Sequence, residues 1–173
     1  LDEQQIEQVL AFDMPVRWGV PVRYHDFCDY CRRIEPDLYE FHLSYRDLSL
    51  KPQPFLSEVA CSRLVVHAPE LFENSELLDL VSDDPAYRQR SIDNLQRVVD
   101  ATLQIGEFFP LADARLIVAN IGGFSADEPR PLAMRPLLYE RFHDACSRID
   151  FAGTELIPQN MALCDQRVTV DYF

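Results

Sequence analysis

Five short apolar segments rich in β-branched residues recur along the chain, and amphipathic segments of helical periodicity lie between them. The apolar segments are WGVPVR, LYEFHLS, RLVVHA, RLIVANI and TELIPQN, at residues 18–23, 38–44, 63–68, 115–121 and 154–160. Apolar segments of this length, with little polar alternation, are typical of strands buried on both faces. We therefore expect an α/β fold in which five strands form a parallel sheet covered by helices.

Three segments between these strands repeat apolar residues at intervals of three or four, which is typical of helices packed on one face. They cover residues 27–34, 92–103 and 138–149. The second helix also has a start signal in SDDP, where an Asp can cap the helix and Pro85 occupies the first turn. Residues 49–62, SLKPQPFLSEVACS, are the least regular segment and predict mostly loop.

Two architectures fit this order of elements: an open doubly wound sheet and a (β/α) barrel. A doubly wound sheet that binds a dinucleotide needs a glycine-rich turn after its first strand, and PVRYHDF at residues 21–27 has no glycine. Polar residues instead follow nearly every predicted strand, and in a barrel those ends converge on one mouth. We therefore expect a single domain over residues 1–173 that forms part of a parallel (β/α) barrel of TIM type.

The polar residues at the predicted strand ends define a candidate site. They are Arg23, His25, His42, Ser44, His67, Glu70, Asn120, Gly122, Gly123, Gln159 and Asn160. Three of the four histidines are in this set, which favours a shared site, whereas His143 lies in the third helical segment and is expected at the surface or in helix packing. Two interpretations stay open for Gly122 and Gly123: a turn, or a backbone that approaches an anion. Two also stay open for Glu70: a site carboxylate, or the start of a helix.

The formal net charge of -13 argues against nucleic acid or an anionic membrane surface as the main partner, because both would be repelled. No apolar run approaches the roughly 18 residues of a membrane span, and the first residues, LDEQQIEQVL, are acidic where a secretory signal is basic. We therefore expect a cytoplasmic protein. Five cysteines, with Cys28 and Cys31 as the nearest pair, are expected to be reduced and partly buried rather than to bind zinc or form a redox pair.

A closed barrel typically has eight strands and about 250 residues. This chain has 173 residues, begins at Leu1 and shows five strand candidates, with a sixth beginning in RVTVDYF at residues 167–173. We interpret it as a fragment of a longer chain, with a partial barrel completed by another chain as the alternative. An unclosed parallel sheet has edges that favour self-association or pairing with a partner.

The series LYEFHLS, RLVVHAPE, SIDNLQRVVDATL, LIVANIGG and ELIPQNM resembles the sugar phosphate isomerase/epimerase family of xylose isomerase-like barrels, related to the endonuclease IV fold. It is most similar to the form found beside or fused to sialic acid synthase-type enzymes of nonulosonic acid pathways. The resemblance runs from about Trp18 to Met161 and is most specific in VVHAPE followed by RQRSIDNLQRVVD. It implies a sugar or sugar phosphate ligand, a divalent zinc, manganese or magnesium ion, and a fused or partner synthase domain.

The resemblance covers His67, Asn120, Gly122, Gly123, Gln159 and Asn160, and the strand-end pattern adds Arg23, His25, His42 and Glu70. Together they predict His67 and Glu70 as catalytic residues and His67 with His42 as metal ligands. The predicted substrate-binding residues are Arg23, His25, His42, Asn120, Gly122, Gly123, Gln159 and Asn160. The family typically has HPGG after its fourth strand, where this chain has NIGG, and a glutamate then asparagine after its fifth, where this chain has Gln159 and Asn160.

Both departures replace a strong ligand with a neutral amide. An amide oxygen can coordinate a hard cation, but it adds no full negative charge and cannot act as a general base near neutral pH. We therefore predict weak or absent metal binding and carry two functional hypotheses. The first is an isomerase or epimerase, and the second is a catalytically degenerate barrel that binds carbohydrate or acts as a scaffold.

Overall fold

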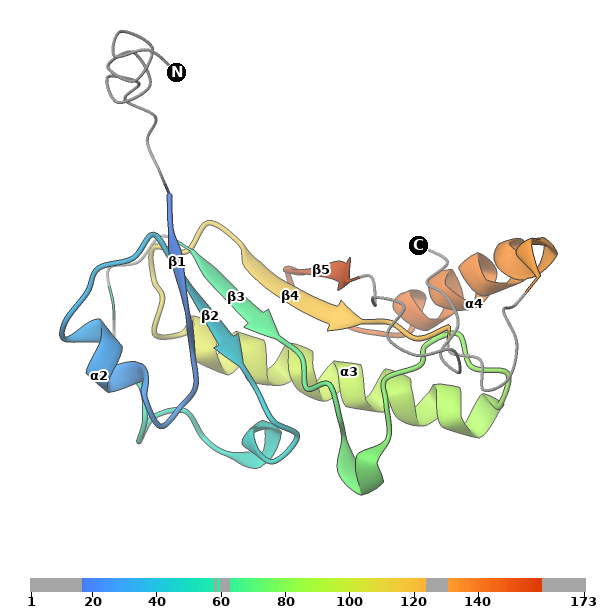
Figure 1. Cartoon of the computed structure of the whole chain (residues 1–173), viewed down its shortest axis with the longest axis horizontal. Helices are drawn as coiled ribbons and strands as arrows, with labels where there is room; N and C mark the ends of the chain where they lie inside the picture. Colours follow the sequence, from blue (N-terminus) through green and yellow to red (C-terminus); the bar gives the residue numbers. More distant parts are fainter. Residues whose placement is uncertain (1–16, 58, 60–62, 124–130, 160–173) are drawn as a thin grey trace, which may run out of the picture.

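The structure is a computed structural model that describes residues 17–57, 59, 63–123 and 131–159. Five strands of these residues form one sheet in the order β1-β2-β3-β4-β5, and every neighbouring pair is parallel (Figure 1). The strands are β1 Gly19–Val22, β2 Leu38–His42, β3 Leu64–His67, β4 Arg115–Asn120 and β5 Thr154–Gln159. The five predicted strands and the parallel α/β class are therefore confirmed. The sheet is compatible with part of a TIM-like barrel, although the described strands do not close into one.

Among the described residues, three α-helices and three short 3₁₀ helices connect the strands. The α-helices are α2 Phe27–Cys31, α3 Pro85–Gly106 and α4 Arg135–Ser147, and the 3₁₀ helices are η1 Asp47–Ser49, η2 Glu73–Ser75 and η3 Leu132–Met134. Helix α3 begins as the sequence predicts, because Asp84 Oδ1 accepts a hydrogen bond from the Ala86 N–H at 2.8 Å and Pro85 is the first helical residue. Helix α2 ends earlier than predicted, and Pro36 follows soon after it, which disfavours helical backbone at the preceding residue.

Alternation along the strands separates the sheet into two faces. On β2, Tyr39 and Phe41 are buried, whereas Glu40 and His42 lie on the opposite face and are partly exposed. The buried face packs on helix α3, which runs along the sheet in Figure 1. The main core contains Phe41, Leu64, Val66 and Ile117 from the strands and Ile92, Leu95, Val98, Val99 and Ile105 from α3. The core therefore lies between sheet and helix, and Glu40, His42 and His67 lie on the other face.

Within the described ranges, no helix is both long and apolar enough to cross a membrane. Cys28, Cys31 and Cys146 are free, partly buried thiols, as the sequence predicts, and Cys61 and Cys164 lie outside the described residues.

Candidate functional site

His42 and His67 lie side by side at the ends of two neighbouring strands. They are register partners on β2 and β3, and their imidazole rings stack with centroids 4.8 Å apart and planes inclined by 11°. The ring separation equals the usual spacing of neighbouring strands, about 4.8 Å, so the stack follows directly from the parallel register. His42 and His67 therefore face the same end of the sheet, where Asn120 and Gln159 are also expected, and a shared functional site stays a prediction.

Both ring nitrogens of His67 have hydrogen-bond partners. Nδ1 lies 2.9 Å from the Ala68 carbonyl oxygen, which can only accept, so Nδ1 carries a proton. Nε2 lies 2.8 Å from Gln159 Oε1, which joins β3 to β5 across 92 residues of sequence. Two arrangements satisfy this contact: an imidazolium donates from Nε2 to the amide oxygen, or the amide is turned and its NH₂ donates to a neutral Nε2. In both arrangements Nδ1 is bound to Ala68, and Nε2 is the ring nitrogen left for the chemistry of the site.

His42 has a carboxylate partner on its own strand. Its Nε2 lies 3.1 Å from Glu40 Oε1, and the two side chains are 39% and 32% exposed. Glu40 was not among the predicted site residues. Its position two residues before His42 was the available signal, because residues at this spacing share one face of a strand.

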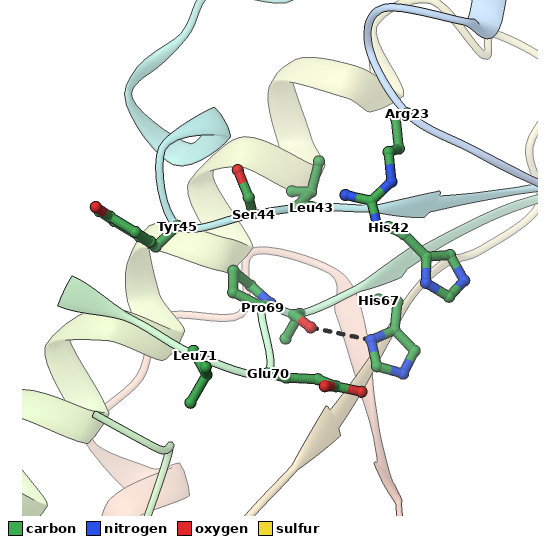
Figure 2. Close-up of a pocket in the computed structure, with 10 residues that line it drawn as sticks. Arg23, His42, Leu43, Ser44, Tyr45, His67, Pro69, Glu70 and Leu71 are labelled. Carbon is green, nitrogen blue, oxygen red and sulfur yellow. Dashed lines mark hydrogen bonds between the residues drawn. The ribbon is translucent and has the colours of Figure 1, made fainter. Parts of the chain in front are cut away.

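The two histidines border a cavity of about 430 Å³ at the carboxyl ends of β1, β2 and β3 (Figure 2). Arg23, after β1, and Glu70, after β3, contribute charged side chains to its lining. This volume falls within the roughly 300–1,000 Å³ typical of small-molecule sites. The structure therefore brings five predicted site residues to one cavity: Arg23, His42, Ser44, His67 and Glu70.

The loop after β2 is held in place by Ser44 and Asp47. The Ser44 N–H and hydroxyl both donate to Asp47 Oδ2, at 2.7 and 2.8 Å. Ser44 also lines the cavity. The hydrogen bonds of this small turn fix the loop beside His42 and so help to define the shape of the cavity.

Tyr24 is a buried phenol behind the first strand end. Its ring stacks on Phe55 with centroids 5.5 Å apart, and its hydroxyl has no hydrogen-bond partner among the described residues. Burial, followed by the nearby Asp47 carboxylate, raises the pKa of Tyr24 to about 12. The phenol is therefore neutral throughout the physiological range.

The glycine pair after β4 forms a turn around a buried carboxylate. Gly122 and Gly123 have φ angles of 102° and 89°, and the Gly123 N–H donates to Asp79 Oδ1 at 3.0 Å. Asp79 is only 6% exposed and also accepts from the Val81 N–H at 3.2 Å. The turn interpretation thus accounts for the pair, and the anion that this backbone approaches is a side chain of the protein itself. Sequence reasoning missed Asp79, although an acidic residue between Leu78 and Leu80 was a signal.

The other predicted residues have different surroundings. Asn120 is paired in register with Gln159, and its buried Oδ1 has no hydrogen-bond partner among the described residues. His25 does not line the cavity; its side chain is 75% exposed, with Nε2 3.8 Å from Asp26 Oδ2. Glu70 lies in a bend ahead of η2 rather than in the first turn of a helix. Asn160 lies outside the described residues.

The donors beside His67 do not fit a tightly bound divalent ion. His67 Nε2 and Gln159 Oε1 are both neutral as metal ligands when the imidazole is uncharged, and the Glu40 carboxylate lies 3.1 Å from His42 Nε2. No group of three or more His, Cys, Asp or Glu side chains within the described ranges is arranged to hold an ion. These donors leave the charge of an ion uncompensated unless the Glu70 carboxylate turns toward them, and we derive no chemical step through a metal.

The fold and the site together define an α/β protein with a polar cavity at the carboxyl edge of a parallel sheet, where ligands of such sheets usually bind. Among known proteins, no family model matches the chain and no curated sequence shows significant similarity to it. The function is therefore argued from the cavity and its residues.

Proposed function

We propose that this chain binds a sugar or sugar phosphate in the cavity at the carboxyl edge of its sheet, as a domain of the sugar phosphate isomerase/epimerase type. The observation that carries the proposal is the convergence of Arg23, His42, His67 and Glu70 on one cavity. A guanidinium suits a phosphate group, while imidazole and carboxylate groups can hydrogen-bond sugar hydroxyls. The sequence resemblance favours the same ligand class and a role in nonulosonic acid biosynthesis.

An isomerase or epimerase must move a proton at a carbon next to a carbonyl group, and this requires a base within reach of that carbon. His67 and Glu70 are the candidate bases in the cavity. With Nδ1 donating to Ala68, a neutral His67 keeps its lone pair on Nε2. His67 can therefore accept a proton once a ligand displaces the Gln159 amide from that nitrogen.

One observation favours the alternative, a degenerate barrel that binds carbohydrate without turnover. Gln159 Oε1 lies 2.8 Å from His67 Nε2, so the candidate base is already hydrogen-bonded within the protein. An amide cannot replace a carboxylate as a base near neutral pH. Binding without catalysis is therefore the second candidate function.

Calorimetry with a panel of hexoses and hexose phosphates tests the binding proposal. We expect saturable binding of at least one phosphate ester and at least tenfold weaker binding by His67→Ala. His143→Ala is the matched control, because His143 is an exposed histidine of α4 outside the cavity. Binding by His67→Ala that equals the unmodified chain would contradict the proposal.

Deuterium exchange from solvent separates the two candidate functions. An isomerase or epimerase incorporates solvent deuterium at the carbon that loses its proton, and this is visible by NMR of the sugar. The assay is run with and without manganese, zinc or magnesium. Incorporation that depends on His67 or Glu70 supports the enzyme, whereas binding without incorporation supports the degenerate domain.

A further inference from the structure

Arg23 and Glu70 are opposite charges in one cavity, and neither side chain is paired with another of the described residues. Both line the cavity, yet neither side chain makes a hydrogen bond or ion pair with any described residue. In Figure 2 the Arg23 guanidinium and the Glu70 carboxylate extend from opposite sides of the view toward the two imidazoles. The charges are therefore available to a ligand.

Other acidic groups near the cavity are already used within the protein. Glu40 lies 3.1 Å from His42 Nε2, and Asp47 accepts two hydrogen bonds from Ser44. Their oxygens hold the rim and the imidazole in place. Glu70 is thus the carboxylate of the cavity lining that is left to accept a hydrogen bond from a ligand. Arg23 is the guanidinium of the same lining.

We propose that the cavity selects a zwitterionic sugar, with an anionic phosphate or carboxylate group bound by Arg23 and a protonated amine bound by Glu70. This inference rests on the proposed sugar-binding function and specifies its ligand as an amino sugar phosphate or an amino sugar acid. The ring hydroxyls then lie beside His42 and His67, which line the cavity with the two charges.

The chemistry of each end favours this assignment. The guanidinium is a planar donor fork that binds a phosphate or carboxylate through two parallel hydrogen bonds. An ionised carboxylate only accepts, so its best partner is a donor, and an ammonium group adds charge attraction to the hydrogen bond.

The net charge of the whole chain also favours a zwitterionic ligand. A formal net charge of -13 repels a purely anionic ligand, and a positive amine on that ligand reduces the repulsion. A zwitterion therefore gains at the Glu70 end and loses less on approach than a sugar phosphate without an amine.

Calorimetry of the full chain in mildly acidic buffer, where the amine is protonated, tests the inference. The probes are glucosamine 6-phosphate, glucose 6-phosphate, N-acetylglucosamine 6-phosphate and glucosamine. We expect glucosamine 6-phosphate to bind about fivefold more tightly than either phosphate without a free amine. Replacing the phosphate probes with glucosaminic and gluconic acids asks whether a carboxylate serves at the Arg23 end.

Two variants test separately how the amine and the phosphate of the ligand are bound. In Glu70→Gln the preference for the amine should disappear, so that glucosamine 6-phosphate and glucose 6-phosphate bind with equal affinity. In Arg23→Gln both phosphates should bind about tenfold more weakly. Glu73→Gln and Arg32→Gln are the matched controls, since both residues are exposed and neither lines the cavity.

The outcomes distinguish this inference from the function on which it rests. Equal binding of glucosamine and glucose 6-phosphates, lost in His67→Ala, would overturn the zwitterion inference and leave the sugar-phosphate function standing. An amine preference that survives Glu70→Gln would also overturn it. Absence of binding by every probe overturns both.

Discussion

His67 links the sheet to the chemistry of the site through its two ring nitrogens. The Ala68 carbonyl fixes the proton on Nδ1, and this leaves Nε2 facing Gln159. A carbonyl partner of this kind is common behind metal-binding and basic histidines, because it fixes the tautomer and the ring orientation. What this histidine can do therefore depends on the group that faces Nε2.

The first prediction at this scale concerns the charge at position 159. Gln159→Glu places a carboxylate beside His67 Nε2, so its affinity for manganese or zinc should rise at least about tenfold by charge compensation. Calorimetry with each ion measures the change, and Gln104→Glu, an exposed position on α3, is the control for added negative charge. Tight binding of an ion by the unmodified chain through His67 and Gln159 would show that we overvalue the missing charge.

The second prediction concerns the buried phenol of Tyr24. Its folded-state pKa is about 12, against about 10 for an unperturbed tyrosine, so the neutral form is favoured in the fold. This contribution to stability is complete below pH 10 and is lost as the pH rises through 12, which amounts to about 2–3 kcal/mol.

Tyr24→Phe should remove that alkaline loss. It should also leave stability near neutral pH unchanged or raised by up to about 1 kcal/mol, because the buried hydroxyl has no partner among the described residues. Urea unfolding at neutral and alkaline pH measures both effects. A loss of about 2 kcal/mol near neutral pH would show that the hydroxyl is hydrogen-bonded.

At the scale of elements, the strands could be predicted because each one is a short segment rich in apolar and β-branched residues. That His42 and His67 lie at the same end of the sheet also followed from the sequence, since both close predicted strands of a parallel sheet. The role of Asp79 could not be predicted, because its hydrogen bond to Gly123 joins residues 44 positions apart. The contact between His67 and Gln159 spans 92 positions and depends in the same way on sheet order.

Two alanine variants, Gly122→Ala and Gly153→Ala, test the turn after β4. A Cβ at Gly122 would collide with the Asp79 side chain and backbone, whereas a Cβ at Gly153 would meet no atom within 4 Å. Both glycines have positive φ, at 102° and 85°, so both alanine variants carry a similar backbone cost of about 1 kcal/mol.

Gly122→Ala should therefore be less stable than Gly153→Ala by about 2 kcal/mol or more, because the Asp79 clash adds to the common backbone cost. Urea unfolding of the two variants measures the difference. Equal destabilisation would mean that Asp79 moves away at little cost and does not hold this turn.

At the scale of the whole molecule, the order of the strands explains why residues far apart in the sequence meet at one cavity. Consecutive parallel strands place the segments after β1, β2 and β3 at one edge, and Arg23, His42 and Glu70 reach one cavity from there. Helix α3 covers the opposite face, so polar groups at this edge do not disturb the core. Closure of the sheet into a TIM-type barrel stays a prediction.

The chain contains four histidines, and this number permits a direct test of the central claim that a sugar phosphate binds at the carboxyl edge of the sheet. His42 and His67 line the cavity, whereas His25 and His143 are exposed and lie outside its lining. The measurement is a titration of the full chain with glucosamine 6-phosphate and glucose 6-phosphate, followed by NMR of the assigned imidazole C–H signals. We predict saturable shifts of the His42 and His67 signals with at least one of the two phosphates and no comparable shift of the other two. Equal movement of all four signals, or movement of none, would contradict the account.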